Sequence, residues 1–130
     1  MPGYLLDTNV LIDWLRNVES VIEVLDSLAA EENQLAVCCL GVAELYAGLR
    51  EPKREPARAV IDALEYWDID PRAAALAGLF RYRYARQGIQ LSTPDMLHGA
   101  LAVSRDATLV TGNVKDFPMP ELKLLPVPAR

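Results

Sequence analysis

Short apolar runs alternate along the chain with segments in which apolar residues recur at helical spacing, which predicts strands separated by helices. Short unbroken apolar runs, as in 3–6 and 35–39, are typical of strands buried on both faces. Between them, in 10–15 and 18–28, apolar residues recur every three or four positions, which indicates amphipathic helices. This order favours an α/β fold with a short parallel β-sheet sandwiched between α-helices. Further strands are expected at 66–69, 108–111 and 122–127, and further helices at 42–49, 56–64, 71–87 and 93–104.

Length and composition fit one ordered domain. The chain has 130 residues, of which 52% are hydrophobic and 24% charged, so we expect a single domain over 1–130 with one core. The longest apolar run, 73–80, is far shorter than the roughly 18 residues that a membrane span requires. No basic segment followed by an apolar stretch opens the chain, so we expect no signal peptide and a cytoplasmic protein.

Charge and cysteine content narrow the function classes. The net charge of −5 argues against a general nucleic-acid binder, which usually carries a basic surface. Acidic residues gathered around a divalent cation would reconcile this charge with a phosphate-containing substrate. The adjacent Cys38 and Cys39 fall in an expected strand, where neighbours point to opposite faces. We therefore expect buried or half-buried free thiols that do not share a metal.

Three of four candidate carboxylates fall where α/β sheets place their active sites, at or just beyond the carboxyl ends of strands, and the fourth, Asp95, would complete an acidic cluster if it joins them. Asp7 ends the first strand, and Asp116 follows the 108–111 strand by a short loop. Glu44 lies one turn into the helix after the second strand, and Asp95 lies in the first turn of the last helix. Clustered carboxylates repel one another unless a cation neutralises them, and Mg²⁺ prefers oxygen ligands. Since the chain has one histidine and no Ser-His-Asp set, these residues favour metal-assisted hydrolysis.

Each carboxylate also has an ordinary structural interpretation. Asp7 is a favourable helix N-cap, and the helix dipole favours Asp95 in a first turn whatever its function. Glu44 could be a solvated helix residue, and Asp116 an ordinary loop acid. Taken singly, none of the four identifies a site, so the sequence around each must decide.

The segments around these carboxylates resemble the motifs of PIN-domain proteins of the VapC toxin type. The segment 7–13, Asp-Thr-Asn-Val-Leu-Ile-Asp, is similar to the opening of that family. The segments 42–49, 95–102 and 109–117 are similar to its glutamate helix, its aspartate helix and its closing motif, in the same order. The resemblance extends over 4–127, nearly the whole chain.

The resemblance implies a PIN-domain fold and an endoribonuclease that depends on Mg²⁺ or Mn²⁺. It also implies the toxin of a type II toxin–antitoxin module, a homodimer that inhibits translation by cleaving RNA until a cognate VapB-like antitoxin binds it. Asp7 and Asp95 are the first choices for direct metal contact, whereas Glu44 and Asp116 would act through metal-bound water. The positions that would brace these carboxylates are Thr8, Asn9, Thr111 and Asn113.

His98 departs from the family pattern, which usually has an aliphatic residue or alanine at this position. It lies three residues after Asp95 and therefore on roughly the same face of the helix. It could reach the site as a proton shuttle or a phosphate contact, or it could be a packed, hydrogen-bonded histidine.

Two basic clusters are candidate RNA-binding surfaces. Arg81, Arg83 and Arg86 alternate with Tyr82 and Tyr84, a combination that suits phosphate contacts and base stacking. A solvated helix face with half-buried tyrosines fits the same pattern, and an acidic stretch of the antitoxin is another candidate partner. The second cluster, with the same alternatives, comprises Arg50, Lys53, Arg54 and Arg58.

Three other functions fit parts of the sequence. A receiver-like signalling domain has this length and fold class, but it needs paired acids after the first strand, and Asp7 has no acidic neighbour. The segment 68–70 is a weak context for a phospho-acceptor aspartate, and Lys115 is the only candidate for the lysine of such a domain. The intact quartet argues against a PIN domain that serves as a binding scaffold, whereas a PIN nuclease that is not a toxin stays open.

Overall fold

The computed structural model describes residues 3–128, and its strands form one parallel five-stranded sheet in the order β3-β2-β1-β4-β5. Each strand has two to four residues, as the short apolar runs predict, and β1 at the centre is paired on both sides. The expected short parallel sheet is confirmed. The strands are β1 (Gly3–Leu6), β2 (Gln34–Val37), β3 (Glu65–Tyr66), β4 (Thr108–Thr111) and β5 (Lys123–Pro126).

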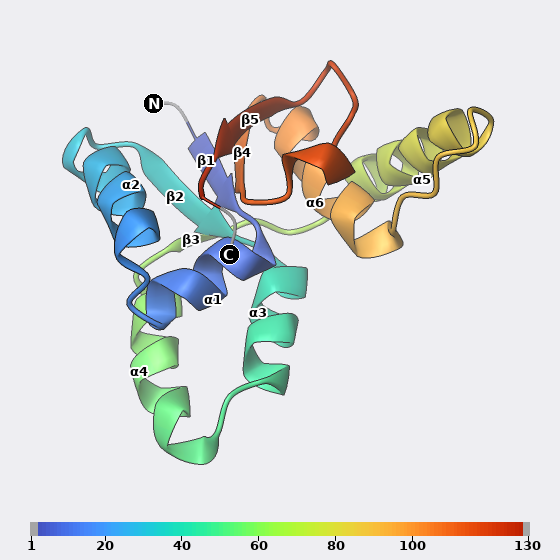
Figure 1. The fold of residues 1–130 in the computed structure, drawn as a ribbon. Helices are drawn as coiled ribbons and strands as arrows, with labels where there is room; N and C mark the ends of the chain where they lie inside the picture. Colours follow the sequence, from blue (N-terminus) through green and yellow to red (C-terminus); the bar gives the residue numbers. More distant parts are fainter. Residues whose placement is uncertain (1–2, 129–130) are drawn as a thin grey trace.

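Helices cover both faces of this sheet. Figure 1 shows α5 and α6 together on one side of the sheet and α1, α2 and α4 on the other. No helix within the described part of the chain is long and apolar enough to cross a membrane. The helices are α1 (Thr8–Leu15), α2 (Glu19–Ala30), α3 (Cys39–Ala47), α4 (Glu51–Asp62), α5 (Pro71–Ala85) and α6 (Thr93–Ser104), with the short 3₁₀-helix η1 (Val114–Asp116) after β4.

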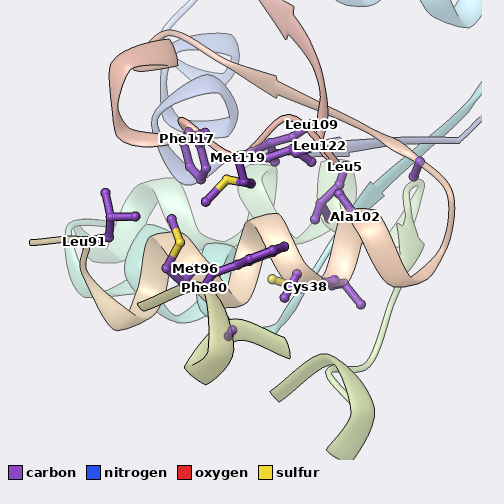
Figure 2. Packing of buried hydrophobic residues seen from close by; sticks show 14 of the residues in the cluster. Leu5, Cys38, Phe80, Leu91, Met96, Ala102, Leu109, Phe117, Met119 and Leu122 are labelled. Atoms are coloured by element: carbon purple, nitrogen blue, oxygen red, sulfur yellow. The ribbon is translucent and has the colours of Figure 1, made fainter. Parts of the chain in front are cut away.

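Successive residues of the central strands point to opposite faces, and this divides the core in two. Leu5 and Leu109 lie in the cluster formed with α5 and α6, whereas Leu6 and Val110 lie in the cluster formed with α1 and α2. All four side chains are fully buried. Figure 2 shows the first cluster, to which α5 contributes Phe80. The sheet is therefore the rigid centre from which the loops at its carboxyl end project.

Three local expectations differ from the structure. The helix expected at 56–64 begins earlier, at Glu51, because Pro52 fits a first helical turn whose N–H groups have no helical partners, and the helix continues through Pro56. The strand expected at 66–69 is reduced to β3 at the sheet edge. Both thiols are free, but they lie past the strand: Cys38 is the buried N-cap of α3, and Cys39 is exposed.

The sheet has a topological switch point between β1 and β4. The chain adds β2 and β3 on one side of β1 and then β4 and β5 on the other. Open α/β sheets bind ligands in the crevice that such a reversal leaves at the carboxyl ends of the strands. The order also excludes the receiver-like alternative, since that fold has the order 2-1-3-4-5. The Asp7 N–H donates to the Val110 carbonyl at 3.0 Å, so β1–β4 pairing extends to the edge of this crevice.

Candidate active site

Asp7 follows β1 directly and lies at the switch point with only 5% of its surface exposed. One carboxylate oxygen, Oδ1, accepts the Thr8 backbone N–H at 2.8 Å, and the other, Oδ2, accepts the Thr111 hydroxyl at 2.7 Å. A buried carboxylate needs such donors because burial otherwise disfavours its charged form. Asp7 is also the N-cap of α1, so its structural role and its site position coexist.

Thr8 joins Asp7 to the predicted glutamate. Its hydroxyl donates to Glu44 Oε1 at 2.8 Å, while its backbone N–H donates to Asp7. Glu44 lies on α3 with an exposed side chain, and Thr8 is buried at the start of α1. Residues 36 positions apart are thus linked at the carboxyl ends of β1 and β2.

Asp95 lies in the first turn of α6, where Ser92 is the N-cap and its hydroxyl accepts the Asp95 backbone N–H at 3.2 Å. Partial burial raises the pKa of Asp95, and the negative charges of Asp7 and Asp116 raise it further, against the opposing Ser92 hydrogen bond. Asp116 ends η1 and is partly exposed. The structure therefore brings Asp7, Asp95 and Asp116 within electrostatic reach of one another.

Ser92 lies outside the set predicted from the sequence. A serine three residues before an acidic residue, with a proline between them, is a common helix start and could have indicated it. The residues predicted to support the carboxylates differ in whether they contact Asp7. The Asn113 backbone N–H donates to the Thr111 hydroxyl at 3.0 Å, so these residues form a hydrogen-bonded chain to Asp7, whereas Asn9 is exposed.

His98 is 1% exposed and lies behind Asp7. Its Nδ1 is 3.2 Å from the Pro94 carbonyl, which can only accept, so Nδ1 carries the hydrogen, and it is 4.0 Å from Asp7 Oδ1. The imidazole also lies near the Cys38 thiol, and its buried Nε2 has no hydrogen-bond partner among the described residues. This position fits the packed interpretation of His98 and leaves no path to a phosphate in solution.

Burial shifts the pKa values of His98 and Cys38 in opposite directions. It lowers the pKa of His98, but the Cys38 thiol, the Asp7 carboxylate and the Pro94 carbonyl outweigh it, and the pKa lies above its ordinary value. Burial raises the pKa of Cys38, but His98 and the backbone of Gly41 and Leu40 hold it below its ordinary value. The raised pKa of His98 therefore favours a positive charge near the Asp7 carboxylate.

The donor chemistry fits a hard divalent cation held partly by water. Within residues 3–128, no three Asp, Glu, His or Cys side chains lie close enough to surround one ion. Mg²⁺ does not require that, because it is usually bound by one or two carboxylates and keeps several waters. The raised pKa of Asp95 reflects its partial burial and, to a smaller extent, the negative charges of Asp7 and Asp116, which such a cation would neutralise.

The arginines predicted as an RNA surface are engaged within the protein. Arg81 Nε donates to the Leu91 carbonyl at 2.9 Å, and Arg83 forms an ion pair with Glu121, with Nη2 and Oε2 2.7 Å apart. Arg86 lies over the ring of exposed Tyr82 at 5.4 Å. Among the described residues, none of the three arginines is hydrogen bonded to a site carboxylate.

Two members of the second basic cluster lie closer to the carboxylates. A groove of about 590 Å³ runs between α1, α3 and α4, and its lining includes Glu44, Arg50 and Lys53. Arg58, in contrast, pairs with Glu55 and Asp62 on the outside of α4. Arg50 and Lys53 therefore give the Glu44 end of the site a basic margin.

Residues 4–118 match the family model described as the PIN domain. The chain belongs to the PIN-domain family. This PIN domain is 31% identical over 120 residues to ribonuclease VapC19 of Mycobacterium tuberculosis, a match that covers 92% of this chain and 96% of that protein. It is 29% identical over 120 residues to ribonuclease VapC2 of Rickettsia felis, covering 88% and 89% of the two chains.

Solved structures extend this likeness to three dimensions. The PIN domain superimposes with a TM-score of 0.85 on a chain of the Rickettsia felis VapBC2 complex bound to a promoter DNA fragment, at 26% identity and covering 96% of this chain and 98% of that one. A chain of the DNA-bound VapBC complex from Salmonella typhimurium gives a TM-score of 0.79 at 27% identity, covering 97% and 98%.

Proposed function

We propose that this PIN domain is a divalent-metal-dependent endoribonuclease and the toxin of a VapBC-like module. The observation that carries the proposal is Asp7, a buried carboxylate held by Thr8 and Thr111 at the switch point and coupled to the charge of Asp95. The similar proteins named ribonuclease VapC, and the one from Salmonella typhimurium named tRNA(fMet)-specific endonuclease VapC, support the reaction class.

The reaction is hydrolysis of a phosphodiester: water adds to phosphorus, one P–O ester bond breaks, and the leaving oxygen takes a proton. In this proposal Asp7 and Asp95 hold Mg²⁺ or Mn²⁺, and Glu44 and Asp116 orient water. The ion, when bound, supplies a polarised phosphate oxygen and a more acidic water. Thr8 and Thr111 fix the orientation of Asp7 through the hydrogen bonds described above.

The partners follow from the neighbours' complexes. VapBC complexes pair a toxin with an antitoxin, and we assign the same kind of partner, a VapB-like antitoxin, to this chain. A homodimer and a cytoplasmic location stay predictions. Roles for Arg81, Arg83 and Arg86 in RNA binding also stay predictions, and of the three, Arg86 with its exposed Tyr82 offers the most open surface.

Expression in bacterial cells tests the toxin role. The wild-type protein should arrest growth and produce new RNA 5′ ends, and co-expression of a cognate VapB-like antitoxin should restore growth. Asp7→Asn should abolish both effects, whereas Asp68→Asn, an exposed acid after β3, should not. Growth arrest that persists in Asp7→Asn would contradict the catalytic toxin, and RNA cleavage without growth arrest would favour a PIN nuclease with another role.

A further inference from the structure

A second cavity lies beside α1, and its lining begins two residues after Asp7. It has a volume of about 250 Å³ and lies between α1 and the segments that follow β4 and β5. Its lining contains none of the four predicted site acids. The residues that line it are Asn9, Val10, Ile12, Asp13, Arg16, Gly112, Asn113, Val127 and Pro128.

Hydrogen bonds connect this cavity to the site. Asn9 follows Asp7 by two residues in the first turn of α1. The Asn113 backbone N–H donates to the Thr111 hydroxyl, which in turn donates to Asp7 Oδ2. A group bound in the cavity would therefore lie next to a residue of the hydrogen-bonded chain that holds Asp7.

The lining has the chemistry of a base-binding pocket. Its apolar lining residues include Val10, Ile12 and Val127, which suit the flat faces of a heterocycle. Its polar lining residues are Asn9, Asp13, Arg16 and Asn113. Pockets for drug-sized ligands measure roughly 300–1,000 Å³. A cavity of about 250 Å³ therefore has room for one ring system.

We propose that this cavity is a nucleobase subsite that binds a guanine of single-stranded RNA adjacent to the cleaved phosphodiester, an inference that rests on the proposed nuclease function. Guanine presents the acceptors O6 and N7, which arginine recognises as a pair, and it presents donors on its Watson–Crick edge that an asparagine carbonyl accepts. Adenine and cytosine place an amino donor where guanine has O6, so they would meet the Arg16 donors unfavourably. Uracil lacks the second acceptor, N7.

Binding of mononucleotides tests the subsite without catalysis. The variant Asp95→Asn, which keeps every residue of the cavity, is titrated with GMP, AMP, CMP, UMP and inorganic phosphate while the Asn9 and Asn113 side-chain amide signals are followed by NMR. GMP should shift both signals with a Kd roughly 10-fold below that of AMP or CMP. Equal shifts by all nucleotides and by phosphate would show an anion site, and no shift would show no site; either result overturns the proposal.

Cleavage of a substrate series tests the same subsite in the active protein. Unstructured RNAs identical except for G, A, C or U at one position are cleaved by the wild type, by Arg16→Gln and by Pro128→Trp, which fills the cavity. The matched control is Arg72→Gln, an exposed arginine on α5. Both cavity variants should reduce the G-to-A ratio of kcat/KM about 10-fold, and the control should not change it.

The outcomes separate this inference from the function on which it rests. If the wild type cleaves RNA but Arg16→Gln and Pro128→Trp keep the base preference of the wild type, the proposed subsite is wrong and the nuclease function stands. If the wild type cleaves no RNA with Mg²⁺ or Mn²⁺, the proposed function is wrong, and the GMP titration alone then decides whether the cavity binds a base.

Discussion

Asp7 is a buried acid that two hydrogen-bond donors hold in place. Its two oxygens accept from Thr8 and Thr111, and the pKa of nearby His98 is raised, which favours positive charge close to the carboxylate. Asp95, in contrast, is only partly buried and experiences the negative charges of Asp7 and Asp116. The two acids favoured for metal contact therefore differ in burial and in the hydrogen bonds that their carboxylates accept.

Thr111→Val tests whether the hydroxyl positions Asp7. The substitution keeps the side-chain shape and removes the donor to Asp7 Oδ2 and the acceptor for the Asn113 N–H. Because partners of metal-binding side chains typically contribute 10–100-fold, Mn²⁺ affinity and kcat should each fall by roughly that factor. The control is Thr108→Val in the same strand, and equal behaviour of the two variants would contradict the positioning role.

His98→Ala should lower RNA cleavage far less than Asp95→Ala. His98 is buried and packed, so its loss should mainly reduce the free energy of unfolding, by about 2–4 kcal/mol, through a cavity in the core. Cleavage rates at saturating Mg²⁺, measured at a temperature where both variants are folded, check the ranking. Equal losses with intact metal binding would show a direct catalytic role for His98.

The raised pKa of Asp95 predicts a pH-dependent stability of the metal-free protein. The folded state binds this proton more tightly than the unfolded state, so the contribution of Asp95 to the free energy of unfolding falls as pH rises from its ordinary pKa of 3.8 through the raised folded value. Urea unfolding in EDTA at several pH values is compared between the wild type and Asp95→Asn. The variant should gain stability relative to the wild type as pH rises, whereas a pH-independent difference would contradict the shift.

At the scale of elements, the start of α6 sets the position of Asp95. Ser92 caps this helix, and Pro94 in its first turn fixes the backbone angle that the helix requires. The Nδ1–H of His98 also donates to the Pro94 carbonyl within the same turn. The helix start is therefore determined by three neighbouring side chains.

Ser92→Ala should affect both stability and catalysis, because the cap and Asp95 share one turn. Asp70→Ala is the matched control, since Asp70 caps α5 through a 2.8 Å bond from the Ala73 N–H, and it is not one of the site residues. Each substitution should cost about 1 kcal/mol of folding free energy. Only Ser92→Ala should also weaken Mn²⁺ binding, and an equal effect of both variants on binding would contradict this account.

Elements were predictable from sequence where local patterns decide them. The central strands show no alternation of apolar and polar residues, because both of their faces are buried, as Leu5 and Leu6 show. The unbroken apolar run nevertheless identifies a strand that is covered on both faces. The early start of α4 was not predictable, because Pro56 usually marks a helix start or break, whereas here the helix already begins at Glu51 and contains both Pro52 and Pro56. The edge strand β3 depends on pairing with β2, which local sequence does not encode.

The site was predictable in composition but not in its contacts. The family-like segments indicate the four acids as candidates together with the flanking Thr8 and Thr111, and strand ends account for the placement of Asp7, Glu44 and Asp116 but not of Asp95. The pairing of Arg83 with Glu121 joins residues 38 positions apart, and an alternating Arg-Tyr pattern cannot show it. The proximity of Cys38 and His98 likewise arises only when α3 and α6 pack near the switch point.

At the scale of the whole molecule, the net charge of −5 is compatible with RNA cleavage, because acidic residues gather at the site and basic residues lie around it. Three acids are coupled at the site, where a divalent cation would convert a repulsive surface into one that attracts phosphate. Arg50 and Lys53 lie along the groove that starts at Glu44, and Arg16 lies between this groove and the smaller cavity. Local positive charge thus borders the acidic centre.

Cleavage of RNA by the purified protein, with the metal as the variable, is the most direct test of the acidic centre. Wild type in Mg²⁺ or Mn²⁺ should cut a single-stranded RNA endonucleolytically, EDTA should stop the reaction, and Asp7→Asn should reduce its rate at least about 100-fold while remaining folded. Asp68→Asn should match the wild type. Undiminished cleavage in EDTA, or by Asp7→Asn, would contradict a metal centre built on Asp7.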